Sequence, residues 1–497
     1  MGSVLNEQAL YTAAQTRELD RIAIEVEGIP GFTLMTAAGA AAFADLSGTW
    51  PWARTVQVFC GTGNNGGDGF IVAALAREAG LAATVYQVGA ADKISGDALL
   101  ARQRAEAAGV SFLDVADFVA AQGVLVDALL GTGLAGGPRE DYAAAIALIN
   151  GSGAPVLALD IPSGLCSDSG CSLGATVQAS RTVTFIGIKR GLVTGAGPEF
   201  VGELRYASLD VPGSVFAAVP ANVFARDLPA CLEMLPRRRR DAHKGSYGHV
   251  LVAGGDRGMG GAALMAAEAA GRCGAGLVSA ATRPEYTAAF ASRRPEVMAH
   301  GINSGLELQP LLSRATVIAI GPGLGQAPWA EQLLQQVLAT DLSLVIDADA
   351  LNLLADRVSA ASRRRDNWVL TPHPGEAARL LGTTTAEVQA DRFGAVQELQ
   401  HRFGGVALLK GPGTLVCGGE QVFVCSGGNP GMASGGMGDV LTGVVSGLLA
   451  QGLAALDAAC LGVCLHARAG DLAAVEGGER GVLATDLMPY LRGLLDG

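Results

Sequence analysis

The stretch TVQVFCGTGNNGGDGFIVAALAREAG, residues 55–80, decides the fold of the first half of the chain. Its β-branched start predicts a strand, its glycine-rich middle predicts a loop, and its Ala-rich end predicts a helix that begins near Phe70. AATVYQVG at residues 82–89 supplies a second strand, which completes a β-α-β unit. Repetition of this unit is typical of a doubly wound α/β domain.

The same alternation continues along the chain, because apolar runs repeatedly end in a loop of small residues. The runs are GVLVDALLGTG (123–133), APVLALDIPSG (154–164), HVLVAGG (249–255), TVIAIGPGLG (316–325), SLVIDADALN (343–352), WVLTPHPGE (368–376) and VALLKGPGT (406–414). After Pro212 the pattern weakens, and the segment from Pro212 to Lys244 is interrupted by Pro220, Pro229 and Pro236. The sequence therefore predicts two α/β domains, residues 1–225 and 226–497.

Composition excludes several classes of protein. A chain of 497 residues with 49% apolar and 16% charged residues forms ordered cores, and its length favours more than one. The formal net charge of −12 argues against nucleic acid as a partner. The run Arg237 to Arg240 is interpreted as a solvated interdomain segment rather than a phosphate-binding patch.

The cellular setting is predicted from cysteines and from apolar runs. Nine cysteines are scattered without a CxxC pair, which favours reduced thiols and a cytoplasmic protein. The N-terminus lacks a signal-peptide layout, and residues 15–21 are interpreted as the polar face of a helix. The apolar stretch from Val440 to His466 is interrupted by polar residues, so no membrane partner is expected.

Two glycine-rich segments carry the phosphate-binding signals. Residues 61–69, GTGNNGGDG, follow a strand and lead into a helix, so their backbone amides can hold an anion; the alternative is a tight turn with an Asx cap. Residues 429–441, NPGMASGGMGDVL, predict an anion hole with Asp439 accepting a hydroxyl proton during phosphoryl transfer. The alternative there is that Asp439 only caps a helix.

Polar residues also end apolar strands of the first half. Asp127, Asp160 with nearby Ser163, and Lys189 all occupy such positions. Carboxylates there can bind a ribose, hold a cation or act as a base. Because parallel strands deliver their carboxyl ends to one edge, a shared crevice is expected.

At these residues the first half resembles the NAD(P)H-hydrate epimerase family, through GTGNNGGDG, VDALLGTGL, LDIPSGL and Lys189 over about residues 10–215. The resemblance implies a Rossmann-like fold and a K⁺ site formed by Asn65, Asp127 and Ser163. It also places Asp160 against the nicotinamide ring, where we expect it to act as acid and base. The implied contacts to the hydrated dinucleotide are Asn64, Asn65, Gly66, Gly67, Asp68, Gly131, Thr132, Gly133, Leu134, Ala135, Gly136, Gly137 and Asp160.

One departure from that family is visible in the sequence. Where its members usually carry Leu-Met-Glu before an Ala-Gly pair, this chain has Leu34, Met35 and Thr36 ahead of Ala38-Gly39. If that Glu serves catalysis, its replacement by Thr36 weakens the prediction of epimerase activity. If it serves helix packing, the prediction is unaffected.

The second half resembles the ribokinase-like kinases at GGMGD and, more closely, the NAD(P)H-hydrate dehydratase family over about residues 236–494. The motifs are residues 243–255, 321–325, 347–352, 371–376 and 410–414. The resemblance implies a ribokinase-like fold, ADP or ATP as co-substrate, and Mg²⁺ held largely by phosphate oxygens and waters. The implied nucleotide-binding residues are Lys410, Gly411, Pro412, Gly413, Thr414 and Gly438, and the implied substrate contacts are Ala262, Gly323, His373 and Asp439.

Together the halves predict a homo-oligomeric enzyme that repairs hydrated NADH and NADPH, called NADHX and NADPHX below. The first domain would interconvert the epimers, and the second would phosphorylate the ring hydroxyl of the S epimer and eliminate it. ADP is the expected donor. One alternative is a ribokinase-type small-molecule kinase with a dinucleotide-binding sensor domain, and another is a catalytically silent dinucleotide-binding protein.

Overall fold

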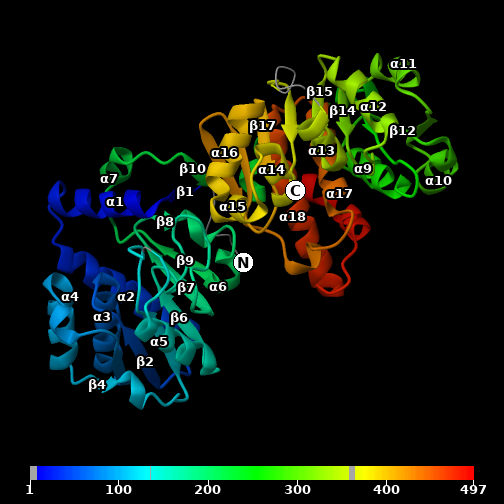
Figure 1. Ribbon diagram of the computed structural model, residues 1–497. Coiled ribbons are helices and arrows are strands. Elements are labelled where there is room, and N and C mark those ends of the chain that lie inside the picture. The colour runs from blue at the N-terminus through cyan, green and yellow to red at the C-terminus, as the bar shows by residue number, and fades with distance from the viewer. Residues whose placement is uncertain (1–7, 135, 358–363, 497) are drawn as a thin grey trace. The chain divides into compact units, whose positions relative to one another are not determined.

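The structure is a computed structural model that describes residues 8–134, 136–357 and 364–496. The chain forms two units, and the division between them falls between Val223 and Phe224 (Figure 1). The boundary expected near residue 225 lies next to this division, within the short strand β10 (Val223–Ala225).

A parallel sheet of seven described strands is the centre of the N-terminal unit, in the order β4-β3-β2-β5-β6-β7-β9. The strands are β2 (Thr55–Cys60), β3 (Ala82–Gln87), β4 (Ser111–Asp114), β5 (Val124–Ala128), β6 (Val156–Leu159), β7 (Arg181–Phe185) and β9 (Glu203–Ala207). The order reverses between β2 and β5, and a doubly wound sheet binds its ligand at such a reversal. The predicted Rossmann-like domain is confirmed.

Helices cover both faces of this sheet. They are α1 (Ala13–Glu25), α2 (Gly31–Thr49), α3 (Asn64–Glu78), α4 (Gly96–Ala107), α5 (Glu140–Gly151), α6 (Gly197–Val201) and α7 (Gly213–Ala218). Val56 and Val58 share one core with α2, α3 and α4, whereas Phe59 shares another with α5. This alternation of buried side chains explains why the parallel strands are apolar throughout. A further short pair, β1 (Gln8–Tyr11) with β8 (Ile188–Lys189), places Tyr11 beside Lys189.

The glycine-rich segment after β2 is helical from Asn64 onward, so the predicted helix start near Phe70 was wrong. Gly63 is the N-cap, and the Gly67 amide donates to the Gly63 carbonyl at 3.1 Å. The glycines allow close packing, because a Cβ at Gly66 would lie 2.2 Å from the Gly61 carbonyl oxygen. A high glycine content therefore marks close approach of α3 to the sheet rather than a long loop.

The C-terminal unit is built on described strands in the order β13-β12-β11-β14-β15-β16-β17-β18-β19. They are β11 (His249–Ala253), β12 (Leu277–Thr282), β13 (Met298–Gly301), β14 (Val317–Ile320), β15 (Ser343–Ile346), β16 (Trp368–Leu370), β17 (Val406–Leu409), β18 (Thr414–Gly418) and β19 (Gln421–Cys425). The pairs from β13 to β17 are parallel, and β17-β18 and β18-β19 are antiparallel. Here the order reverses between β11 and β14.

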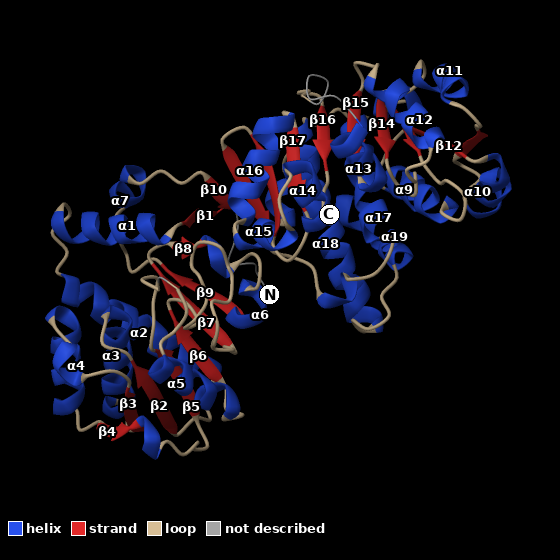
Figure 2. Cartoon of the chain, viewed as in Figure 1, coloured by secondary structure: helices blue, strands red, loops and turns tan. Residues whose placement is uncertain are grey.

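Helices again enclose the sheet of this unit (Figure 2). They are α8 (Leu228–Leu232), α9 (Gly260–Arg272), α10 (Thr287–Arg293), α11 (Gln309–Leu312), α12 (Pro328–Leu338), α13 (Ala348–Arg357), α14 (Pro374–Leu381), α15 (Thr385–Ala390), α16 (Arg392–Phe403), α17 (Met437–Ala450), α18 (Ala455–Gly477) and α19 (Met488–Asp496). α9 and α17 pack closely at Gly443, which has no side chain to separate them. A Cβ there would lie 2.1 Å from the Ala266 carbonyl oxygen.

α18 is the one described helix whose length and apolar composition would allow it to span a membrane. Most of that apolar segment is buried inside the unit, in contact with α17, α19 and α8. In this structure α18 is a core helix.

Two candidate active sites

A cavity of about 580 Å³ lies at the carboxyl ends of β2, β5 and β6, where the order of the N-terminal sheet reverses. Of the predicted contacts, those that line it are Asn64, Asn65, Asp68, Gly131, Thr132, Gly133, Leu134 and Asp160. Gly66, Gly67, Gly136 and Gly137 are not among the lining residues, and Ala135 lies outside the described residues. The predicted crevice therefore exists, and most of the polar residues predicted for it face it.

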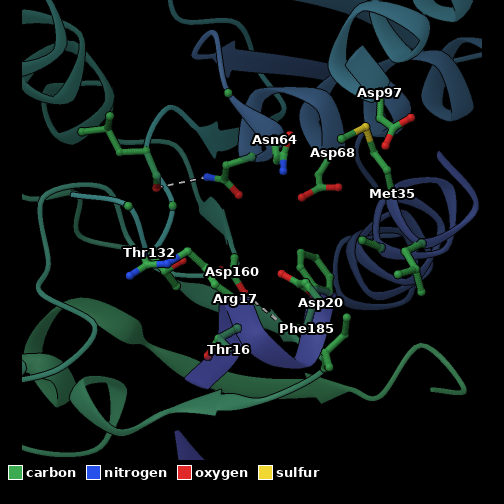
Figure 3. A pocket seen from close by; sticks show the side chains of 18 of the residues that line it. Thr16, Arg17, Asp20, Met35, Asn64, Asp68, Asp97, Thr132, Asp160 and Phe185 are labelled. Carbon is green, nitrogen blue, oxygen red and sulfur yellow. Dashed lines mark hydrogen bonds between the residues drawn. The ribbon is translucent and has the colours of Figure 1, made fainter. Parts of the chain in front are cut away.

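Asp160 projects into this cavity from the residue after β6 (Figure 3). Its φ of +65° is a left-handed conformation that non-glycine residues rarely adopt. Its Oδ1 forms an ion pair with the buried Lys189 ammonium, and it accepts from the Phe185 amide at 3.3 Å and the Thr184 hydroxyl at 3.4 Å. These donors fix the direction of the carboxylate, and a fixed carboxylate in a cavity suits a base.

The other charged groups of the cavity come from helices and from its rim. Figure 3 shows Asp20 of α1 and Asp68 of α3 pointing into the same space as Asp160. Burial raises the pKa of Asp20 to about 6, and burial with the charges of Asp160 and Asp20 raises the pKa of Asp68 well above its usual value. Two cations, Arg17 and Arg139, also line the cavity and suit a diphosphate.

Sequence reasoning missed the contribution of α1. Residues 15–21 were expected to form a polar outer face, whereas Thr16, Arg17 and Asp20 line the cavity. A signal was present, since Asp20 follows the buried Leu19 and stands one turn from the buried Thr16. Polar residues along the buried side of an amphipathic helix indicate that this side faces a polar, water-filled cavity.

An oxygen-rich cluster lies beneath the loop that follows β5. The buried Asp127 accepts from the Ser163 amide at 2.8 Å and the Ser163 hydroxyl at 2.6 Å. Asn65 donates from Nδ2 to the Leu130 carbonyl at 3.1 Å, while its Oδ1 is buried without a hydrogen-bond partner. An orphaned amide oxygen beside a carboxylate, a hydroxyl and a carbonyl fits a hard cation such as K⁺. Asp127 is fully buried, which excludes it as a ribose ligand.

Thr36, which stands where the related epimerases carry Glu, lies on α2. It is not among the residues that line the cavity, whereas its neighbours Leu34, Met35 and Ala38 are. In this structure the wall of the cavity formed by α2 is apolar.

The second candidate site centres on Asp439, in the first turn of α17. Gly436 is the N-cap with φ +93°, a conformation that favours glycine, and the amides of this turn point toward an incoming anion. Burial and the negative charges of Asp347 and Asp349 outweigh Lys410 and raise the pKa of Asp439 to about 7. Asp439 is therefore poised to accept a proton near neutral pH.

Beside Asp439 lies an ion network that joins the ends of β15, β16 and β17. The Lys410 ammonium donates to Asp347 Oδ1 at 2.8 Å and lies 3.8 Å from Glu376 Oε2. The other Asp347 oxygen accepts from the Thr442 hydroxyl at 2.8 Å. A Cβ at Gly438 would lie 3.3 Å from Lys410 Nζ, so the absence of a side chain there keeps the ammonium open to a phosphate.

His373 stands at the end of β16 and caps α14. Its Nδ1 accepts from the Gly375 amide at 2.9 Å, and its Nε2 lies 3.4 Å from Glu376 Oε1. Burial and the charges of Lys410 and Arg379 lower the pKa of His373, so the ring is neutral and its Nε2–H is a donor. His373 lies outside the core, because half of its side chain is exposed.

The remaining predicted residues lie at the same edge of the sheet, Ala262 on α9 and the others on glycine turns. Gly323 has φ +57°, and a Cβ on it would lie 3.0 Å from Ala262, so these two predicted contacts are neighbours. The turn Lys410–Thr414 follows β17, and the Thr414 hydroxyl donates to the Gly411 carbonyl at 2.9 Å. Buried Arg392 donates to the carbonyls of Leu409, Lys410 and Gly413 at 3.4 Å, which fixes that turn.

Sequence reasoning did not single out Asp347, Glu376 or Arg392. For two of them a signal existed: Asp347 directly follows β15, and Glu376 stands three residues after the cap His373. Arg392 had none, because nothing in a helix start predicts a guanidinium buried against a distant turn.

Family models and relatives agree with this arrangement. A model described as NAD(P)H-hydrate dehydratase matches residues 250–492, and one described as the YjeF-related protein N-terminus matches residues 31–191. The bifunctional NAD(P)H-hydrate repair enzyme of Coxiella burnetii is 52% identical over 98% of this chain and 99% of its own length. The enzyme of the same description from Vibrio cholerae is 43% identical over 98% of both chains.

Solved structures match the C-terminal unit. A ribokinase-like superfamily protein from Enterococcus faecalis is 31% identical with a TM-score of 0.51, covering 55% of this chain and 96% of that protein. A protein from Streptococcus mutans is 30% identical with a TM-score of 0.51, covering 55% of this chain and 99% of that protein. The predicted ribokinase-like fold is confirmed. With two family models in this order and relatives aligned over nearly its whole length, the chain belongs to the bifunctional NAD(P)H-hydrate repair enzyme family.

Proposed function

We propose that this protein repairs NADHX and NADPHX in two steps, epimerisation in the N-terminal unit and nucleotide-dependent dehydration of the S epimer in the C-terminal unit. The observation that supports this most is the pairing of two different acid-base sites in one chain. One is a cavity that contains the Asp160–Lys189 pair, and the other is a glycine turn bearing Asp439.

In the N-terminal unit, Asp160 acts as the acid and base for inversion at the hydrated ring carbon. Lys189 and the Phe185 amide fix the position of its carboxylate in the cavity. Arg17 and Arg139 would bind the diphosphate, and Asn64 and Thr132 would orient the nicotinamide end. Glycines 131 and 133 let the backbone approach the dinucleotide closely.

In the C-terminal unit, Asp439 takes the proton of the ring hydroxyl as that oxygen attacks the terminal phosphoryl group of the nucleotide. The P–O bond to the nucleotide breaks, and the hydroxyl becomes a phosphate ester, which is a good leaving group. The lone pair of the ring nitrogen then forms a C=N⁺ bond as the C–O bond breaks and phosphate leaves. Loss of a proton from the adjacent ring carbon restores NADH or NADPH. His373 and the Ala262–Gly323 surface would hold the nicotinamide, and the Lys410–Thr414 turn with Gly438 would hold the nucleotide.

K⁺ would be held by Asn65, Asp127 and Ser163, which offer the oxygen donors described above. When bound it supplies a fixed positive charge beneath the loop after β5. Mg²⁺ would neutralise the phosphates of the nucleotide. No group of three His, Cys, Asp or Glu side chains suited to a metal occurs among the described residues, so phosphate oxygens and waters would have to supply most of its ligands.

ADP is the donor we favour over ATP, on the resemblance of the fused architecture to bacterial members of the family. We also infer a cytoplasmic homo-oligomer. The nine cysteines are scattered along the sequence without a CxxC pair, which agrees with a reducing compartment.

The test is recovery of reduced-nicotinamide absorbance from mixed-epimer NADHX with Mg²⁺ and ADP, ATP or neither, for wild type and Asp439→Asn. The proposal predicts nucleotide-dependent recovery that the variant loses. A stable phosphorylated product without recovery would instead indicate the ribokinase-type kinase, and binding without turnover would indicate a silent dinucleotide-binding protein.

A further inference from the structure

Inversion of a hydrated carbon by loss and re-addition of water needs proton transfer on both faces of the ring. A hydroxyl leaves one face as water, for which it must gain a proton, and a new water adds to the other face and must lose one. A single carboxylate on one side of the cavity serves only one of these events. The cavity should therefore hold a second group that carries a proton.

Asp160 is already engaged on the sheet side of the cavity. Its carboxylate pairs with Lys189 and accepts from Thr184 and Phe185, so it serves as the proton acceptor. Lys189 is not available as the second proton carrier, because its ammonium also donates to the Thr184 hydroxyl and the Phe185 carbonyl, both at 3.1 Å.

Asp68 faces the cavity from α3, in the helix layer, and has a different environment. Among the described residues no hydrogen bond or ion pair reaches its carboxyl, or that of Asp20 on α1. Both carboxyls point into the cavity in Figure 3. The other charged groups that line it are Asp97, Asp160, Arg17, Arg139 and Lys189. Burial, then Asp160, then Asp20 raise the pKa of Asp68, which favours the protonated form of this carboxyl.

We propose that Asp68 is the second catalytic residue of the epimerase, acting from the helix layer while Asp160 acts from the sheet, and that Asp20, which points into the same cavity, is a positioning residue for Asp68. This inference rests on the proposed epimerase function and names a role for two residues that function does not specify.

The step balances with water as the only co-reactant. The Asp68 carboxyl gives its proton to the ring hydroxyl, the C–O bond breaks, and the ring-nitrogen lone pair forms a C=N⁺ bond as water leaves. A second water adds to the opposite face, its electron pair forms the new C–O bond, the C=N electrons return to nitrogen, and Asp160 takes the proton. The two carboxyls have then exchanged protonation states, ready for the opposite epimer.

The variants Asp68→Asn, Asp68→Glu and Asp20→Asn test this in the full chain, with Glu18→Gln as the control. Glu18 lies on α1 with Asp20 but pairs with Arg21 and is not among the lining residues. Interconversion of purified epimers is followed by chromatography without nucleotide. Asp68→Asn should reduce kcat by at least about 100-fold, Asp68→Glu should restore part of it, and Glu18→Gln should match wild type.

The pH profile of Asp20→Asn separates the positioning role from a purely structural one, because a structural role would leave the alkaline limb of the profile unchanged. Activity requires protonated Asp68, so it falls as pH rises through the pKa of Asp68. Removing the charge of Asp20 lowers that pKa, so the alkaline limb should move to lower pH. An unmoved alkaline limb would overturn the role of Asp20.

Inversion in H₂¹⁸O should place one solvent oxygen in each inverted molecule, after correction for exchange without enzyme. Inversion without label would mean ring opening and would overturn the proposed step. Undiminished inversion by Asp68→Asn would overturn the role of Asp68 while leaving the epimerase function intact. Absence of interconversion by wild type would instead remove the proposed function itself.

Discussion

The pKa of Asp439 is raised by the fold to a value that suits proton transfer, and burying this carboxylate lowers the stability of the folded state. Its pKa of about 7 lies far above the ordinary value for a carboxyl because the folded chain buries it beside Asp347. As a base it must be ionised, so kcat/KM for dehydration should rise with pH through about 7 and level off above. Measurement of the pH profile with saturating nucleotide checks this, and a rate that is flat from pH 6 to 8 would contradict the role.

The same shift predicts a change in stability. Between its ordinary pKa and about 7 the folded state binds more protons than the unfolded state, so the free energy of unfolding falls as pH rises through that window. Asp439→Asn has no such proton to lose. The variant should therefore have a higher Tm than wild type at pH 8, with the difference shrinking toward pH 4, while its dehydration rate falls by at least about 100-fold. A lower Tm at pH 8 would show that the carboxylate stabilises the fold.

The orphaned oxygen of Asn65 predicts cation-dependent stability. If Asn65, Asp127 and Ser163 hold K⁺, replacing NaCl by KCl at constant ionic strength should raise the Tm of the N-terminal unit, because a ligand that binds only the folded state stabilises it. Asn65→Ala should abolish the difference. Asp117→Asn, an exposed acid of the same unit, should retain it. Equal Tm values in the two salts for wild type would count against the site.

At the scale of elements, the close packing of α3 on the sheet predicts the effect of a single methyl group. Gly66→Ala would place a Cβ 2.2 Å from the Gly61 carbonyl oxygen, and backbone cannot move away cheaply. The N-terminal unit should lose about 1–3 kcal/mol of stability and epimerase activity should fall, while dehydration of the S epimer continues. Gly48→Ala, in α2 with open space around it, is the matched control and should be neutral or slightly stabilising. Similar Tm values for both variants would contradict this packing argument.

The elements also show what the sequence could predict and what it could not. Each apolar run before a glycine or proline turn is a parallel strand, because fully buried strands have no polar face. The start of α3 was misplaced because glycines that serve close packing are indistinguishable in sequence from glycines that form a loop. Asp20 and Arg392 escaped prediction because their roles depend on contacts with segments distant along the chain. Asp127, Asp160 and Asp439 could be predicted as site residues because they stand near strand or helix ends, which sequence patterns locate.

At the scale of the whole molecule, the two units act in sequence on one substrate, an arrangement called the relay below. Hydration produces both epimers, the C-terminal unit consumes the S form, and the N-terminal unit converts R to S. Asp160→Asn should therefore convert only the S fraction of mixed-epimer NADHX at early times, whereas wild type converts all of it. Chromatography of the residual substrate checks this, and loss of both epimers at equal rates in the variant would contradict it.

The most direct measurement supplies purified (R)-NADHX with Mg²⁺ and ADP to wild type, Asp160→Asn and Asp439→Asn, and follows NADH and the S epimer together. The relay predicts complete conversion to NADH by wild type, accumulation of the S epimer without NADH in Asp439→Asn, and unchanged R epimer beyond the uncatalysed background in Asp160→Asn. Formation of NADH from the R epimer by Asp160→Asn at the wild-type rate would contradict the account, because the second unit would then need no epimerase.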